Sequence, residues 1–225
     1  MELPLKCDIM QRIRILFSKK EPIQFTGALD MQKIWERTFR RAKAPLAYSQ
    51  GFHPQPKLNM ACPLPLGFTS DYEILDAWLD TENADLSAIA STLQQAAPAG
   101  IGIKSIFIVE LSSPSVQAIS LAADYQVTSL DEQIVIEPSL IEEKILHPTS
   151  IPRDRRGKSY DLKPLIQSID LHPQSDGKGY QLDIRLSASE GATGRPEEVI
   201  LALGLNPFDF LYHRVMLHFS TPVMP

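Results

Sequence analysis

The segment Tyr48–Lys57 holds the most unusual set of chemically useful side chains in this 225-residue sequence. Gly51 permits a backbone turn that other residues resist, and two prolines stiffen the residues after it. Such a loop can hold aromatic side chains at fixed surface positions, here Tyr48, Phe52 and His53. Rigid exposed rings suit base stacking or docking to a partner, and Lys57 adds a positive charge. The alternative is that Phe52 fills a gap in the core and the prolines only shape a crossover.

Proton transfer by His53 together with Tyr48 is a second possible chemistry for this loop. The sequence has five histidines, and their spacing is not typical of zinc sites: His53, His147, His172, His213 and His218. The last two are five residues apart in a predicted strand, so we expect them to point to opposite faces. The glycine-rich phosphate loops of nucleotide-binding proteins are also missing. We therefore expect neither a metal nor a cofactor.

A run of positive charge accompanies the first predicted helix. Nine basic and three acidic residues lie between Arg12 and Lys43, a surplus of six in a chain whose net charge is -5. The basic side chains opposite the apolar side of the helix, with one just beyond its end, are Lys33, Arg37, Arg40, Arg41 and Lys43. Such an asymmetry attracts phosphates or an acidic partner, and Arg12 and Arg14 would extend it. The alternative is an ordinary solvated helix face.

A second basic group lies in Ile151–Lys163, which we predict to be a hairpin. Gly157 suits its tight turn, which would place three arginines and a lysine at the tip. Arginine forks bind phosphates at two points and stack on bases. The candidate binding residues here are Arg153, Arg155, Arg156 and Lys158.

The composition is typical of a globular protein, with 44% hydrophobic and 22% charged residues. No apolar run approaches the roughly 20 residues needed to span a bilayer, and the N-terminus lacks the pattern of a signal peptide. The two cysteines, Cys7 and Cys62, are too few for a disulfide framework or a four-cysteine zinc site. These features predict a cytoplasmic protein that does not bind membranes.

Hydrophobic periodicity and helix-breaking residues predict the elements that would position these side chains. In the first half they are a strand Gln11–Phe17, a helix Ala28–Ala42, strands near Leu58–Cys62 and at Asp71–Asp80, a helix Asp85–Ala97 and a strand Ile101–Leu111. In the second half they are a strand Ile119–Val127, a helix Pro138–Leu146, strands Leu165–Leu171 and Tyr180–Leu186, a helix from Arg195 to Gly204 and a strand Leu211–Phe219.

Each half therefore has the order βαββαβ. This order predicts an α+β fold of two tandem ferredoxin-like lobes, residues 1–112 and 116–225, the second with an inserted basic hairpin. The joint would lie near Ser112–Ser115.

Several of these segments resemble the radical-SAM-linked family of uncharacterised bacterial proteins. The matching runs are Arg12–Lys19, Phe25–Asp30, Trp35–Arg37, Arg40–Ala42, Pro45–Pro54, Pro63–Gly67, Ser150–Arg153, Arg156–Lys158, Asp161–Ile166 and Arg195–Glu198. The sequence departs from the family at Gln55, where its members usually have histidine, which weakens a two-histidine site in the loop. It also differs in the acidic segment Thr69–Glu73.

The resemblance implies a partner. Members of that family accompany a radical SAM enzyme as a neighbour or a C-terminal fusion, often near genes for a ribonuclease and ribosomal proteins. This chain lacks the three-cysteine motif of radical SAM enzymes, so it cannot perform that chemistry alone. The resemblance thus implies an accessory module whose target is RNA or the translation apparatus.

Three functional hypotheses follow. The first is an RNA-binding accessory subunit in which the basic helix, the hairpin and the aromatic loop form one surface. The second is a protein-docking module that binds the radical SAM partner through the same surface, without nucleic acid. The third is an RNA-processing enzyme that uses His53 and Tyr48.

Overall fold

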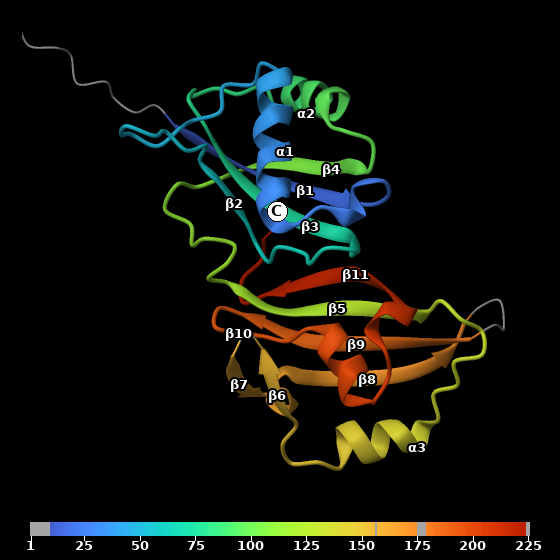
Figure 1. The fold of residues 1–225 in the computed structure, drawn as a ribbon. Coiled ribbons are helices and arrows are strands. Elements are labelled where there is room, and N and C mark those ends of the chain that lie inside the picture. The colour runs from blue at the N-terminus through green and yellow to red at the C-terminus, as the bar shows by residue number, and fades with distance from the viewer. Residues whose placement is uncertain (1–9, 156, 175–178, 224–225) are drawn as a thin grey trace, which may run out of the picture. The chain divides into compact units, whose positions relative to one another are not determined.

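The computed structural model describes residues 10–155, 157–174 and 179–223. Within these residues the chain has a mixed α+β fold with a large, mostly antiparallel sheet and four α-helices (Figure 1). The α+β class predicted from the periodicity is therefore confirmed. None of the described helices is long and apolar enough to cross a membrane.

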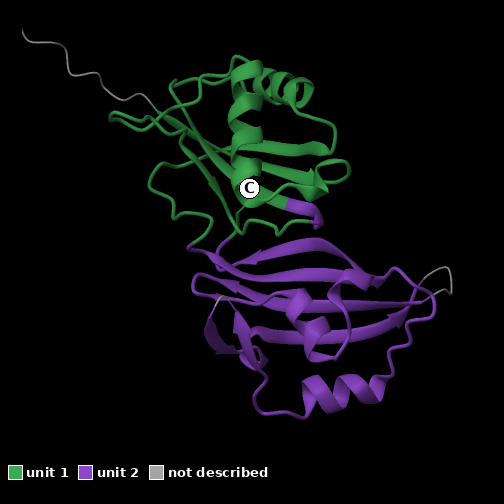
Figure 2. Ribbon diagram, in the orientation of Figure 1, with its two compact units in different colours: residues 1–66, 73–117, 222–225 green, residues 67–72, 118–221 purple. Residues whose placement is uncertain are grey.

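The chain divides into two compact units, coloured separately in Figure 2. Unit 1 consists of residues 1–66, 73–117 and 222–225, and unit 2 of residues 67–72 and 118–221. The units are therefore not consecutive halves, because each contains a short segment that is remote in sequence from the rest of it.

Unit 1 has the element order βαββαβ. Its elements are β1 (Gln11–Lys19), α1 (Ala28–Arg41), β2 (Leu58–Met60), β3 (Thr69–Leu79, of which residues 73–79 belong to this unit), α2 (Leu86–Ala96) and β4 (Ile101–Val109). The strand order is β4-β1-β3-β2, with β1 antiparallel to β4 and β2 antiparallel to β3. The side chain of Asp85 caps the start of α2 by accepting hydrogen bonds from the amides of Ser87 and Ala88.

The helices of unit 1 cover one face of its sheet. Alternate residues of β1 turn towards them, so Ile13, Ile15 and Phe17 are buried against Trp35 and Phe39 of α1. The rings of Phe17 and Trp35 meet edge to face, with centroids 4.8 Å apart. This packing fixes which side of α1 faces solvent.

The other face of the same sheet contains a buried charge cluster. Arg12 and Arg14 of β1 alternate with the apolar residues, and both bind Asp76 of β3. Arg12 also donates to the carbonyls of Ser113 and Pro114, and Arg14 to that of Val223. The segments that lead out of and back into unit 1 therefore contact this face.

Unit 2 contains the remaining strands of the large sheet and a separate two-stranded sheet. Its elements are β5 (Ser120–Ser129), α3 (Pro138–Ile141), β6 (Pro152–Arg155), β7 (Lys158–Asp161), β8 (Ile166–Pro173), β9 (Tyr180–Ser189), β10 (Ala192–Thr193), α4 (Pro196–Ala202) and β11 (Phe210–Phe219). The main strand order is β8-β9-β5-β11, and β10 pairs with β9. Thr69 and Ser70 of β3 lie in this unit and pair in parallel with β11.

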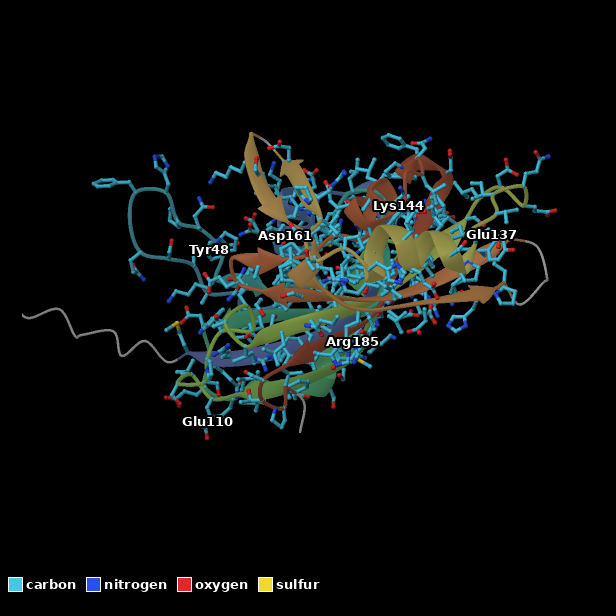
Figure 3. All side chains as sticks on the ribbon, turned by 90° about the horizontal axis from the view of Figure 1, so that it is seen from below. Tyr48, Glu110, Glu137, Lys144, Asp161 and Arg185 are labelled. Carbon is cyan, nitrogen blue, oxygen red and sulfur yellow. The ribbon has the colours of Figure 1, made fainter. Side chains whose placement is uncertain are left out.

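One face of the unit 2 sheet is apolar and the other is polar. Tyr125, Val127 and Leu182 are buried on the apolar face, whereas Asp124 and Arg185 lie on the polar one. Figure 3 shows Arg185 on the opposite side of the strands from Lys144, which follows α3.

The predicted elements are present, with boundaries that shift by a few residues. The first predicted helix of unit 2 is the main difference, because only Pro138–Ile141 is α-helical and residues 142–146 form a π-helical turn. The inserted hairpin is confirmed as β6 and β7, which form a two-stranded sheet of their own.

Candidate functional site

Five exposed cations line the solvent side of α1 and its end. Trp35 and Phe39 point into the core, so positions three or four residues apart on the opposite side remain in water. We call these residues the basic face: Lys33, Arg37, Arg40, Arg41 and Lys43. Lys43 has a left-handed backbone (φ 55°), which ends the helix. Positive charge in the last turn also interacts favourably with the helix dipole.

The segment Tyr48–Lys57 forms a braced loop, which we call the aromatic loop. The amide of Ser49 donates to the carbonyl of Gln55 (2.8 Å), and the amide of Gln55 donates back to the Ser49 hydroxyl (2.9 Å). At the base, Lys57 N–H donates to the carbonyl of Ala47 (2.9 Å). Gly51 at the tip has a positive φ of 131°, as its predicted turn requires.

Phe52 is fully exposed at the tip of this loop, with a relative accessibility of 101%. Leaving such a side chain in water forgoes about 1.5–3 kcal/mol that burial would contribute. The alternative that Phe52 fills the core is therefore wrong. In Figure 3 the side chains beyond Tyr48 point into open space. His53 is exposed next to Phe52.

Tyr48 joins the aromatic loop to the basic face. Burial raises the pKa of its phenol, and Glu36 of α1, to which the hydroxyl hydrogen-bonds, raises it further. Arg40 is close enough to oppose this rise. Two parts of the candidate site are thus adjacent in the same unit. The loop also borders a hollow of about 290 Å³ whose lining includes Tyr48, Pro54 and Lys57.

Arg12 and Arg14 do not belong to this exposed surface. They are 2% and 4% exposed, and Asp76, which is fully buried, balances them. Both were predicted to contact RNA or a partner, and their burial corrects this prediction. Their guanidinium groups are used inside unit 1.

The hairpin arginines lie in unit 2 and are partly engaged. Arg153 Nε donates to Glu198 of α4 at 2.8 Å, so its charge is paired. Arg155 is half-buried, whereas Lys158 is exposed after Gly157, whose φ of 74° fits the predicted turn. Arg156 lies outside the described residues. The hairpin is therefore less available for an anion than its sequence indicates.

The surroundings of His53 and Tyr48 bear on the enzymatic hypothesis. No group of three or more histidine, cysteine, aspartate or glutamate side chains among them could hold a metal ion. No described residue bonds the imidazole of His53, and the Tyr48 hydroxyl is bound to Glu36.

Two histidines of β11 correct another expectation. A bulge between Arg214 and Met216 shifts the register, so that His213 pairs with Gln126 and His218 with Ala122. Gln126 and Ala122 lie on the same face of β5, so both imidazoles are on one face and not on opposite ones. Each binds a different carboxylate, His213 that of Asp71 at 3.0 Å and His218 that of Asp124 at 2.8 Å.

Sequence reasoning missed Glu36 and Asp76. Glu36 was counted only as one of the acids that reduce the charge of the helix, but it holds the base of the aromatic loop. Asp76 stands between Leu75 and Ala77 in an otherwise apolar part of β3. An acid in that position requires a buried cation, and this signal could have identified the partners of Arg12 and Arg14.

Two solved structures show weak similarity to this chain. A structure described as a DyP-type peroxidase from Shewanella oneidensis is 11% identical, with a TM-score of 0.21 and coverage of 90% of both chains. An encapsulated DyP-type peroxidase from Mycobacterium smegmatis is 10% identical, with a TM-score of 0.20 and coverage of 95% of this chain and 93% of the other. Scores this low carry no argument about fold or function.

Comparison with curated proteins finds no match. A family model does match, and it covers residues 12–196, which include the basic face, the aromatic loop and the hairpin. The chain therefore belongs to the family of uncharacterised proteins conserved in bacteria named DUF2344.

Proposed function

We propose that the chain is a non-catalytic accessory module that binds RNA through the basic face and the aromatic loop. The observation that carries this proposal is the adjacency of five exposed cations to a braced loop with a fully exposed phenylalanine. Cations bind the phosphates of a nucleic acid, and exposed rings stack on its bases.

The charge distribution supports a polyanionic ligand at unit 1. Residues of unit 1 include 12 basic and 11 acidic side chains, whereas unit 2 has 10 basic and 16 acidic ones. Five exposed cations gather on the basic face of α1 in a chain whose net charge is -5, and a polyanion would be attracted to this region.

The partner that we propose is a radical SAM enzyme, on the basis of the sequence resemblance. The chain itself has two cysteines and cannot hold the cluster of such an enzyme. A module that binds RNA would then present it to the enzyme. We further propose that both units are ferredoxin-like lobes, supported by the strand orders β4-β1-β3-β2 and β8-β9-β5-β11.

The test is RNA binding over a series of salt concentrations. Each phosphate contact to a single strand contributes about -0.7 to the slope of log K against log salt, so five cations predict about -3.5. Substitution of Arg37, Arg40 and Arg41 by glutamine leaves two cations and predicts about -1.4. Substitution of Lys20, Lys104 and Lys144 by glutamine removes the same charge elsewhere and is the matched control.

The outcomes separate the hypotheses. Weak binding by the α1 variant alone supports the proposal, and equal binding by the α1 variant and the wild type contradicts it. If the wild type binds no RNA but still captures the radical SAM enzyme after nuclease treatment, the chain is a protein-docking module. RNA cleavage that is lost in a His53→Ala variant would instead indicate the enzymatic hypothesis.

A further inference from the structure

We propose that the site selects single-stranded RNA, with phosphates along α1 and one unpaired base stacked on Phe52. This inference rests on the proposed function and names its substrate class. It is carried by the position of Phe52 on a braced loop and by the spacing of the cations on α1.

Phe52 offers a ring that only an unpaired base can cover. Its side chain is fully exposed, and the hydrogen bonds between Ser49 and Gln55 hold the loop that displays it. Bases inside a duplex are stacked on each other, so their faces are not available to a side chain. The bases of a single strand have free faces, and aromatic stacking accepts all four of them.

The spacing of the cations on α1 fits a single RNA strand that lies along the helix. Lys33, Arg37 and Arg41 follow one another at four-residue steps along the exposed side of the helix. Four residues rise about 6 Å, a distance that successive phosphates of a polynucleotide can also span. One strand laid along α1 would therefore meet one cation at each turn of the helix.

The aromatic loop lies near the C-terminal end of this row of cations. Tyr48, at the base of the loop, contacts Glu36 and lies near Arg40 in the C-terminal half of α1. Lys43 follows the helix directly and is exposed. A strand that follows the cations thus arrives at the loop, and one of its bases can turn onto Phe52. About three or four nucleotides would occupy the site, from one phosphate at each helical turn.

The experiment compares a fluorescent single-stranded RNA of 12 nucleotides with the same sequence in a duplex, by anisotropy. We expect the single strand to bind at least tenfold more tightly. Phe52→Leu should weaken binding of the single strand about 5- to 150-fold, the range that base stacking supports, and leave duplex binding unchanged. Its salt slope should remain at the wild-type value because the cations are intact.

Two further variants control for the substitution itself. Phe25→Leu changes another exposed phenylalanine of unit 1, 68% accessible and outside the aromatic loop, and should bind like the wild type. Phe52→Trp should keep the affinity, and its fluorescence should be quenched when a base stacks on the ring. Since Phe52 has no packing to lose, both of its variants should have the melting temperature of the wild type.

The outcomes distinguish this inference from the proposed function. Equal or tighter binding of the duplex, or an unchanged affinity of Phe52→Leu for the single strand, overturns the inference while RNA binding stands. No binding of either RNA overturns both. Competition by polyglutamate at the same charge concentration as the single strand would show an acidic protein surface as the ligand, and this also overturns the inference.

Discussion

The buried cluster of Arg12, Arg14 and Asp76 should contribute strongly to the stability of unit 1. Asp76 has no exposed surface, and its two oxygens accept four hydrogen bonds from the two guanidinium groups. Asp76→Asn keeps the shape of the side chain but removes the negative charge. Two buried guanidinium groups would then lose their common anion, and we expect a loss of about 3–5 kcal/mol in the free energy of unfolding.

The two tryptophans of the chain make the assay specific for this unit. Trp35 and Trp78 are its only tryptophans, and both belong to unit 1. Urea denaturation followed by tryptophan fluorescence therefore reports on unit 1, whereas far-ultraviolet circular dichroism reports on both units. With a urea dependence of about 2 kcal/mol per molar, a loss of about 4 kcal/mol lowers the fluorescence midpoint by roughly 2 M.

Two control variants test this prediction. Asp80→Asn removes an exposed carboxylate just beyond the same strand and should change stability by less than about 0.5 kcal/mol. A triple variant with Arg12→Met, Arg14→Met and Asp76→Leu should recover much of the loss, since an apolar group often replaces a buried ion cluster well. Recovery would be incomplete because the carbonyls of Ser113 and Val223 lose their donors. A loss below about 1 kcal/mol in Asp76→Asn would refute the reasoning.

Three further predictions concern single positions. Gly100→Ala should destabilise unit 1 by several kcal/mol, because the φ of Gly100 is +97° and the added Cβ would lie 2.6 Å from the carbonyl oxygen of Lys20. In the control Gly27→Ala the added Cβ meets no atom within 4 Å. Thermal melting compares the two variants. Burial raises the pKa of Glu197, so stability falls as the pH rises from the ordinary carboxyl pKa through the raised one. Glu197→Gln should therefore raise the urea midpoint at pH 8 but not at pH 4, and an equal change at both would contradict this. Burial alone would raise the pKa of Asp124, but hydrogen bonds from Arg185 and His218 lower it overall. The carboxylate therefore stabilises the fold above the ordinary carboxyl pKa, and this stability is lost as the pH falls through the lowered value. Asp124→Asn should weaken the dependence of the melting temperature on pH below about pH 4.

Local patterns predicted the elements well because local physics determines them. The alternation in β5 and the three- and four-residue steps in α1 each have one good interpretation, and Gly157 at its turn has the positive φ expected there. The exposure of the basic face followed from the same periodicity. These features depend on neighbours a few residues away.

Features that depend on remote contacts were not predictable in this way. The alternating Arg12 and Arg14 are typical of a strand with one solvated face, but residues about 100 and 209 positions later cover that face. The bulge in β11 that brings His213 and His218 to one face leaves no periodic signal. The bond between Tyr48 and Glu36 depends on how the loop returns along α1, which spacing alone does not determine.

The exchange of short segments between the units has a consequence for synthesis on the ribosome. The chain passes between the units at residues 66, 72, 117 and 221, and the carbonyl of Val223 accepts a hydrogen bond from Arg14. Unit 1 therefore cannot complete its contacts when its first 117 residues have emerged, because one of its own segments is translated after all of unit 2. A nascent chain halted before residue 222 should present unit 1 in a less stable, protease-sensitive form, although most of its sequence is already outside the ribosome.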